Sequence, residues 1–163
     1  MQTTIVTATE QYADVIKQLA EDTWWPTYSP ILTEEQIRFM LDKIYDVEVL
    51  RQQIITGEQT FLILKEDDNP VGFAGYSAYG DNDYKLHKLY CLPQTQGKGY
   101  GKLLINTVAD IAKKAGAQNL LLNVNRYNKA KSFYEKMGFS ILREEDIAIG
   151  PFWMNDYIMQ KPL

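Results

Sequence analysis

The sequence predicts a mixed α/β fold in which helices cover both faces of one sheet. Helical and strand-like patterns alternate along the chain instead of separating into two halves. Short turns rich in Gly, Asn, Asp and Pro separate these patterns. No linker, internal repeat or low-complexity segment interrupts the 163 residues. We therefore expect residues 1–163 to form a single domain.

The first third of the chain is predicted to form one strand followed by helices. Apolar residues recur at helical spacing between Thr9 and Trp25, and Pro26 is predicted to end that helix. Thr33 and Gln36 form a capping box, which covers free backbone N–H groups where a helix begins. The predicted elements are a strand over residues 4–8 and helices over residues 9–25, 34–44 and 47–55.

The rest of the chain is predicted to form a three-stranded meander and then alternating helices and strands. Turn-forming residues at positions 67–70 and 80–83 favour tight connections between the first three strands. Gly116 is predicted to end the next helix, and Asn128 to cap the last one. The predicted strands cover residues 60–64, 71–78, 84–92, 119–124, 140–148 and 153–159, and the helices cover residues 102–115 and 128–137.

The composition argues against several classes of protein. A formal net charge of −4 does not suit a nucleic-acid binder, which normally carries a basic face. No segment approaches the roughly 18 apolar residues of a membrane span, and the N-terminus lacks a signal-like pattern. We therefore expect a cytoplasmic protein with no membrane or nucleic-acid partner. With one His and one Cys, no metal site is expected.

The most informative segment is the glycine-rich loop from Gln96 to Lys102, which lies between an apolar strand and a helix. Its three glycines leave backbone N–H groups uncovered at the positive end of the helix dipole, where phosphates bind. Lys98 and Lys102 add positive charge. The spacing fits neither the P-loop nor the dinucleotide fingerprint, but it fits Gln-x-x-Gly-x-Gly. The loop therefore predicts a pyrophosphate site for a phosphorylated cofactor.

Gln96, Gly99 and Gly101 resemble the pyrophosphate-binding signature of the GNAT superfamily of acetyl-coenzyme A-dependent N-acetyltransferases. A second block, from Asn128 to Phe139, is also typical of that family and follows in the expected order. The resemblance implies a central mixed, mostly antiparallel sheet with helices on both faces. It also implies acetyl-coenzyme A as the cofactor.

The resemblance assigns roles to particular residues. Tyr134 would protonate the departing thiolate, as a general acid; the alternative is a core aromatic on the apolar side of its helix. The strand before the glycine-rich loop would pair its backbone with the pantetheine arm and offer an N–H to the oxyanion. The implied cofactor-binding residues are Leu89, Tyr90, Cys91, Leu92, Gln96, Gly97, Lys98, Gly99, Tyr100, Gly101, Lys102, Asn128, Ala130 and Phe133.

The residues that would serve the acceptor amine are less defined by the sequence. His87 is the only histidine, and an unperturbed pKa of ~6.5 suits a base; the alternative is a strand residue facing solvent. Trp24, Trp25 and Tyr28 lie where the family forms part of its acceptor pocket, and aromatic faces attract ammonium groups. The alternative for these aromatics is a core or lid cluster.

Together these features favour an N-acetyltransferase that moves an acetyl group to a primary amine of a small molecule by direct attack. The chain is also similar to bacterial polyamine acetyltransferases around Thr23-Trp24 and at residues 155–159. Two alternatives stay open: acetylation of a peptide or protein N-terminus or lysine, and a non-catalytic acyl-coenzyme A sensor. The sequence leaves open the acceptor, the base and the choice between monomer and homodimer.

Overall fold

The computed structural model describes residues 1–163 and contains one seven-stranded sheet in the order β1-β2-β3-β4-β5-β7-β6. Neighbouring strands are antiparallel except for β4 and β5, which run parallel. This arrangement confirms the predicted mixed, mostly antiparallel sheet. The strands are β1 Thr3–Thr7, β2 Thr60–Glu66, β3 Asn69–Tyr79, β4 Asp83–Cys91, β5 Asn119–Asn125, β6 Ser140–Ile149 and β7 Phe152–Pro162.

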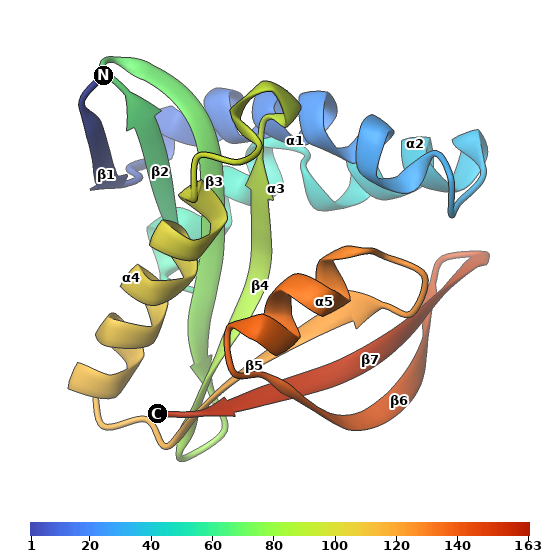
Figure 1. The fold of residues 1–163 in the computed structure, drawn as a ribbon. Helices are drawn as coiled ribbons and strands as arrows, with labels where there is room; N and C mark the ends of the chain where they lie inside the picture. Colours follow the sequence, from blue (N-terminus) through green and yellow to red (C-terminus); the bar gives the residue numbers. More distant parts are fainter.

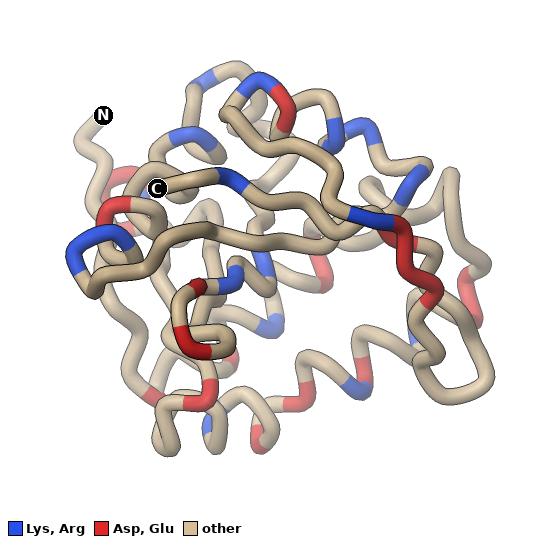
Figure 2. Tube along the Cα trace, turned by 90° about the horizontal axis from the view of Figure 1, so that it is seen from below, with Lys and Arg blue, Asp and Glu red and all other residues tan.

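Five α-helices cover the two faces of this sheet, with α1, α2 and α3 on one face and α4 and α5 on the other (Figure 1). No helix has both the length and the apolar character that a membrane span requires. Lys, Arg, Asp and Glu are spread along the chain with both signs mixed (Figure 2). The helices are α1 Ala13–Tyr28, α2 Glu34–Ile44, α3 Val47–Thr56, α4 Tyr100–Lys114 and α5 Ala130–Lys136.

Alternating residues of β2 divide the interior into two cores. Phe61 and Ile63 pack with α1, α2 and α3, whereas Leu62 and Leu64 pack with α4. All four side chains are buried because helices cover both faces of this strand. The continuous apolar run in the sequence therefore reflects a strand that lies inside the protein.

The first helix differs from its prediction at both ends. It begins at Ala13, after a short 3₁₀ turn, and it continues to Tyr28 with Pro26 inside its last turns. A proline there removes a backbone donor and costs about 3 kcal/mol in a helix interior. The buried Tyr28, whose hydroxyl lies 2.8 Å from that of Tyr90, stabilises the extra turn. Tertiary contact thus outweighs the local signal for a break.

The pairing of β4 with β5 is short, and this feature positions the site. Only residues 83–86 of β4 pair with residues 119–122 of β5, after which the strands separate (Figure 1). A bulge on the other side of β4 leaves His87 without an opposite residue on β3. Bulges bend a strand and redirect its side chains. The β5-facing edge of residues 87–91 therefore has no strand partner.

Candidate active site

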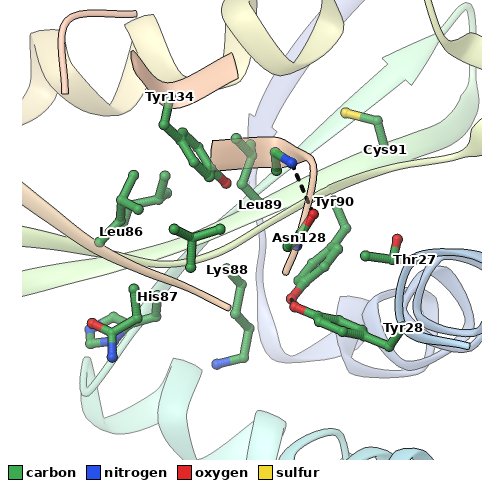
Figure 3. A pocket seen from close by; sticks show the side chains of 14 residues that line it. Thr27, Tyr28, Leu86, His87, Lys88, Leu89, Tyr90, Cys91, Asn128 and Tyr134 are labelled. Carbon is green, nitrogen blue, oxygen red and sulfur yellow. Dashed lines mark hydrogen bonds between the residues drawn. The ribbon is translucent and has the colours of Figure 1, made fainter. Parts of the chain in front are cut away.

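Two adjoining hollows lie where β4 and β5 separate. The larger, here called the loop cleft, measures about 590 Å³ and lies between the glycine-rich loop, the end of β4 and α5. The smaller, here called the strand pocket, measures about 200 Å³ and lies between β4, β5 and the end of α1 (Figure 3). Both are lined by Leu89, Cys91, Ala130 and Tyr134, so the two hollows meet at these residues.

The glycine-rich loop supplies backbone donors to the loop cleft. Gly97 and Gly99 have φ angles of 88° and 79°, in the left-handed region that favours glycine. Leu103 is the first residue of α4 whose N–H bonds back to a carbonyl, that of Gly99 at 3.0 Å, so the preceding amides lack such a partner. The predicted cofactor residues that line the cleft are Leu89, Cys91, Leu92, Gln96, Gly97, Gly99, Tyr100, Gly101, Lys102, Ala130 and Phe133.

The two lysines of the loop occupy different environments. Lys102 lines the loop cleft, where it adds positive charge near the N-terminus of α4. Lys98 does not line the cleft, because its ammonium group pairs with the Glu66 carboxylate at 2.6 Å. The Tyr100 hydroxyl donates to the same carboxylate. These two hydrogen bonds lower the pKa of Glu66, and the bond from Lys98 has the larger effect. They also connect the loop to β2.

Tyr134 lies on α5 between the loop cleft and the strand pocket. Its ring packs against Phe133 and Phe139, with centroids 5.4 and 5.9 Å away. Figure 3 shows its hydroxyl directed into the strand pocket. Burial raises the pKa of this phenol well above its ordinary value, so the hydroxyl keeps its proton near neutrality. Tyr134 therefore packs in the core through its ring and presents a protonated hydroxyl to the pocket.

Asn128 and Tyr90 line the strand pocket in different ways. The Asn128 side-chain oxygen accepts the N–H of Ala130 at 2.9 Å, although the N-cap of α5 is Lys129, one residue after the predicted cap. Tyr90 turns its ring toward Tyr28 and Trp24, in the core on the α1 face. Burial raises the pKa of both tyrosines, that of Tyr28 to about 12. The side chain of Tyr90 thus closes one end of the pocket.

His87 lines the strand pocket, but its chemistry differs from that of a free imidazole. Its Nε2 lies 2.7 Å from the Ser77 hydroxyl. Although the ring is accessible, surrounding protein desolvates it and lowers its pKa to about 4, with added repulsion from Lys88 and Lys85. His87 is therefore neutral at pH 7, yet it is a much weaker base than an alkylamine, whose conjugate acid has a pKa of ~10.4.

Lys88 is a pocket residue that the sequence analysis did not identify. Its side chain is only 8% exposed, and its ammonium group donates to the Gln59 side-chain oxygen at 2.9 Å. The same group lies over the rings of Tyr45 and Phe61. Burial lowers the pKa of Lys88 to about 8. The bulge at His87 shifts the inside–outside alternation of β4, so the sequence pattern gave no signal for a buried lysine.

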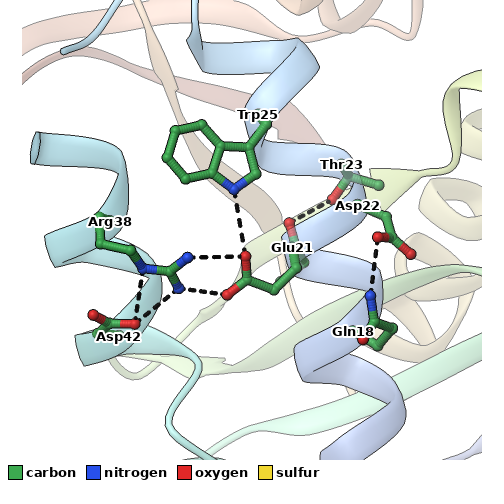
Figure 4. Close-up of polar contacts among 8 residues, drawn as sticks. Gln18, Glu21, Asp22, Thr23, Trp25, Arg38 and Asp42 are labelled. Carbon is green, nitrogen blue, oxygen red and sulfur yellow. Dashed lines mark hydrogen bonds and ion pairs between the residues drawn. The ribbon is translucent and has the colours of Figure 1, made fainter. Parts of the chain in front are cut away.

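Of the three predicted acceptor-site aromatics, one lines the strand pocket and a second lines a hollow next to it. Tyr28 lines the strand pocket, and Trp24 lines a neighbouring hollow while its indole N–H donates to the Tyr45 hydroxyl at 3.2 Å. Trp25 lines neither hollow. Its indole N–H points toward the Glu21 carboxylate, which also pairs with Arg38 (Figure 4).

Cys91 contributes an apolar surface to the junction of the two hollows. It is a free cysteine, and burial raises the pKa of its thiol to about 11. The neutral thiol therefore dominates at pH 7, and the nucleophilic thiolate is scarce. Direct attack by an acceptor fits this site better than a covalent cysteine intermediate.

A cleft beside a glycine-rich helix N-terminus that meets a second pocket has the layout expected of an enzyme that transfers a group between two bound molecules. The profile of the acetyltransferase (GNAT) domain matches residues 28–153 of the chain. An uncharacterized N-acetyltransferase of Mycobacterium tuberculosis is 30% identical over 152 residues, which cover 93% of this chain and 97% of the relative. The chain belongs to the GNAT family of N-acetyltransferases. It is an acyltransferase that uses acetyl-coenzyme A.

Named relatives act on acceptors of different chemistry. The crystal structure of PaiA N-acetyltransferase from Thermoplasma acidophilum, in complex with coenzyme A, is 29% identical, has a TM-score of 0.86 and covers 100% of both chains. A spermidine N(1)-acetyltransferase of the same organism is 29% identical over 153 residues, covering 91% of this chain and 89% of the relative. A ribosomal protein bS18-alanine N-acetyltransferase of Haemophilus influenzae is 38% identical over 79 residues, covering 48% and 53%.

The first prediction concerns Gly101, in the first turn of α4. We expect Gly101→Glu to weaken acetyl-coenzyme A binding by at least about 100-fold, because it places a negative charge where the pyrophosphate would lie. Gly101→Ala is the matched control, since an added Cβ would lie 3.4 Å from the Phe133 ring and need only a small shift. Calorimetric titration measures both. Equal affinities for the two variants would contradict the pyrophosphate assignment.

The second prediction concerns the pH dependence of His87. Because the pKa of His87 is about 4, the ring stays neutral from about pH 6 to pH 9. We expect His87→Ala to change turnover by one constant factor across that range, measured as a pH–rate profile. Ser77→Ala, which removes only the hydrogen bond of the ring, is the control. A loss that is largest above about pH 6.5 and shrinks below it, where an ordinary imidazole is protonated in the parent as well, would show that His87 titrates as an ordinary base.

Proposed function

We propose that this protein transfers the acetyl group of acetyl-coenzyme A to a primary amine of a small molecule, with polyamines as the favoured acceptor class. The observation that carries the proposal is the junction of the loop cleft and the strand pocket at Leu89 and Tyr134. A cofactor and an acceptor can approach this junction from opposite sides. The similarity to a spermidine N(1)-acetyltransferase over 91% of this chain supports the acceptor class.

The residues of the loop cleft suit the cofactor. The N-terminus of α4 and Lys102 would hold the pyrophosphate, and the unpaired edge of residues 87–91 would pair with the pantetheine arm. When bound, acetyl-coenzyme A supplies an activated thioester. A backbone N–H near Leu89 would stabilise the negative charge that develops on the carbonyl oxygen.

Direct transfer requires a neutral amine and a protonated leaving group. The amine nitrogen attacks the acetyl carbonyl carbon, forming a C–N bond as the C–S bond breaks. Tyr134 donates its hydroxyl proton to the sulfur, which leaves as a thiol, and the resulting phenolate regains a proton from water. The nitrogen releases a proton to water, to which His87 can contribute only weakly because of its low pKa. A partly enclosed pocket that desolvates its lining groups, as it does His87 and Lys88, favours the neutral amine over the ammonium form.

A third prediction tests the role of Tyr134. Tyr134→Phe removes one hydroxyl and keeps the ring between Phe133 and Phe139, so the fold should survive. We expect kcat to fall about 10- to 100-fold. General acid catalysis typically contributes roughly 10²–10⁴-fold, and the effect should be at or below the low end here because a thiolate leaves readily without protonation. The affinity for acetyl-coenzyme A should barely change.

Tyr127→Phe is the matched control for this measurement, since Tyr127 is 72% exposed and lines neither hollow. Steady-state kinetics and direct cofactor titration should be made on both variants. If Tyr134→Phe keeps full activity, the hydroxyl has no part in the reaction and the residue serves only the core. If the parent protein binds acetyl-coenzyme A but acetylates no amine, the alternative of a non-catalytic acyl-coenzyme A sensor would be favoured.

A further inference from the structure

A third hollow of about 210 Å³ lies beyond the strand pocket, between β5, β7 and the first two helices. We call it the β7 pocket. It shares Tyr28, Leu86, His87, Tyr90 and Asn123 with the strand pocket, so the two are continuous neighbours. Its lining includes neither Tyr134, the general-acid candidate, nor Leu89 and Cys91 of β4. A group in the β7 pocket would therefore lie away from the reacting atoms.

Two buried oxygen atoms at the β7 pocket have no hydrogen-bond donor. Asp156 is only 5% exposed, and its Oδ1 atom has no partner. Its Oδ2 atom accepts the side-chain N–H of Asn123 at 3.3 Å, which leaves the Asn123 Oδ1 atom buried and also without a partner. Buried polar atoms are almost always paired in folded proteins. Two unpaired acceptors beside one hollow indicate that a donor is missing.

Nearby cations of the protein do not supply this donor. Lys85 lines the pocket, but its ammonium group lies over the Tyr79 ring, 5.1 Å from the centroid. The Arg126 guanidinium pairs with Asp146 at 2.7 Å. It also donates to the backbone carbonyl of Asp156, but not to the side-chain carboxylate of that residue. The carboxylate of Asp156 makes no ion pair within 4.0 Å. Its negative charge is therefore available to a ligand.

The remaining walls of the pocket indicate the rest of that ligand. They are mostly apolar or aromatic, and Asp156 is the one carboxylate among the lining residues. An alkylammonium group matches these properties, because its N–H groups donate to oxygens while its methylenes contact apolar walls. An anionic ligand would be repelled. The apolar and aromatic lining residues are Trp24, Tyr28, Met40, Ile44, Leu86, Tyr90, Ile147, Ile149 and Met154.

We propose that the β7 pocket binds the second ammonium group of a diamine or polyamine, through Asp156 and Asn123, while the first amine is acetylated in the strand pocket. This proposal rests on the proposed function and specifies its substrate class. Asp156 acts on specificity and does not touch the reacting atoms. The site selects acceptors that carry two amines joined by an alkyl chain.

The test compares 1,4-diaminobutane with butylamine, which has the same chain and lacks the second amine. In the parent protein, kcat/KM should be higher for the diamine. Asp156→Asn keeps the size of the side chain and removes its charge, so kcat/KM for the diamine should fall about 10- to 100-fold, mainly through KM. The value for butylamine should fall far less. Asp146→Asn, an exposed carboxylate on β6, is the matched control and should leave both values unchanged.

Three outcomes overturn the proposal. In the first, the parent protein has the same kcat/KM for the diamine and for butylamine. In the second, Asp156→Asn lowers kcat/KM for both amines by the same factor. In the third, Asp156→Asn changes kcat/KM for neither amine. An equal loss of kcat/KM for both amines would show that Asp156 contacts the reacting amine or supports the fold. A lower melting temperature with unchanged preference would assign it to internal pairing with Lys85. If Asp156→Asn does not fold, Asn123→Ala takes its place, with a smaller selective loss expected for the diamine.

A binding measurement separates this proposal from the proposed function. Calorimetric titration of 1,4-diaminobutane and butylamine onto the coenzyme A-loaded protein requires no turnover. If no amine is acetylated but the diamine binds and loses affinity in Asp156→Asn, the pocket assignment stands and the proposed reaction fails. If amines are acetylated but diamine affinity does not depend on Asp156, the reaction stands and the pocket assignment fails.

Discussion

The early end of the β4–β5 pairing is the constraint on which the rest of the site depends. Parallel strands that are neighbours in a sheet normally pair their backbone N–H and C=O groups along their whole length. Here only four residue pairs form before β4 and β5 separate. The bulge at His87 bends β4 at the point of separation. The two cores, one on each face, hold the separated strands in place. The two hollows therefore lie at an opening between strand backbones, beside the glycine-rich loop.

Burial gives this opening a consistent electrostatic character. It lowers the pKa of His87 and Lys88 and raises that of Tyr134 and Cys91, so each group is shifted toward its neutral form. Such an environment suits an acceptor amine that must lose its charge before it attacks. Burial also raises the pKa of the Asp156 carboxyl, which lies in the adjoining pocket, where a bound cation would favour its charged form.

Local patterns predicted the features that depend on local physics. The Thr33 cap was confirmed by the 3.2 Å bond from the Gln36 N–H, but the Gln36 side chain donates to the Trp153 carbonyl and does not complete the predicted capping box. Gly97 and Gly99 in the loop adopt the φ angles that favour glycine. The sequence did not predict the continuation of α1 past Pro26, because a contact with Tyr90 on β4 decides it. The meeting of Asp156 with Asn123 depends on the β5–β7 register, which no short segment specifies.

The position of β6 at one end of the sheet has a consequence for how the protein behaves in a crowded solution. An end strand offers unpaired backbone groups to any other extended chain, and β6 is exposed along most of its length. Four charged residues in succession, Arg143, Glu144, Glu145 and Asp146, occupy its middle. Three negative charges on one short edge repel a second copy of the same edge. The strand thereby protects the sheet from growing into aggregates.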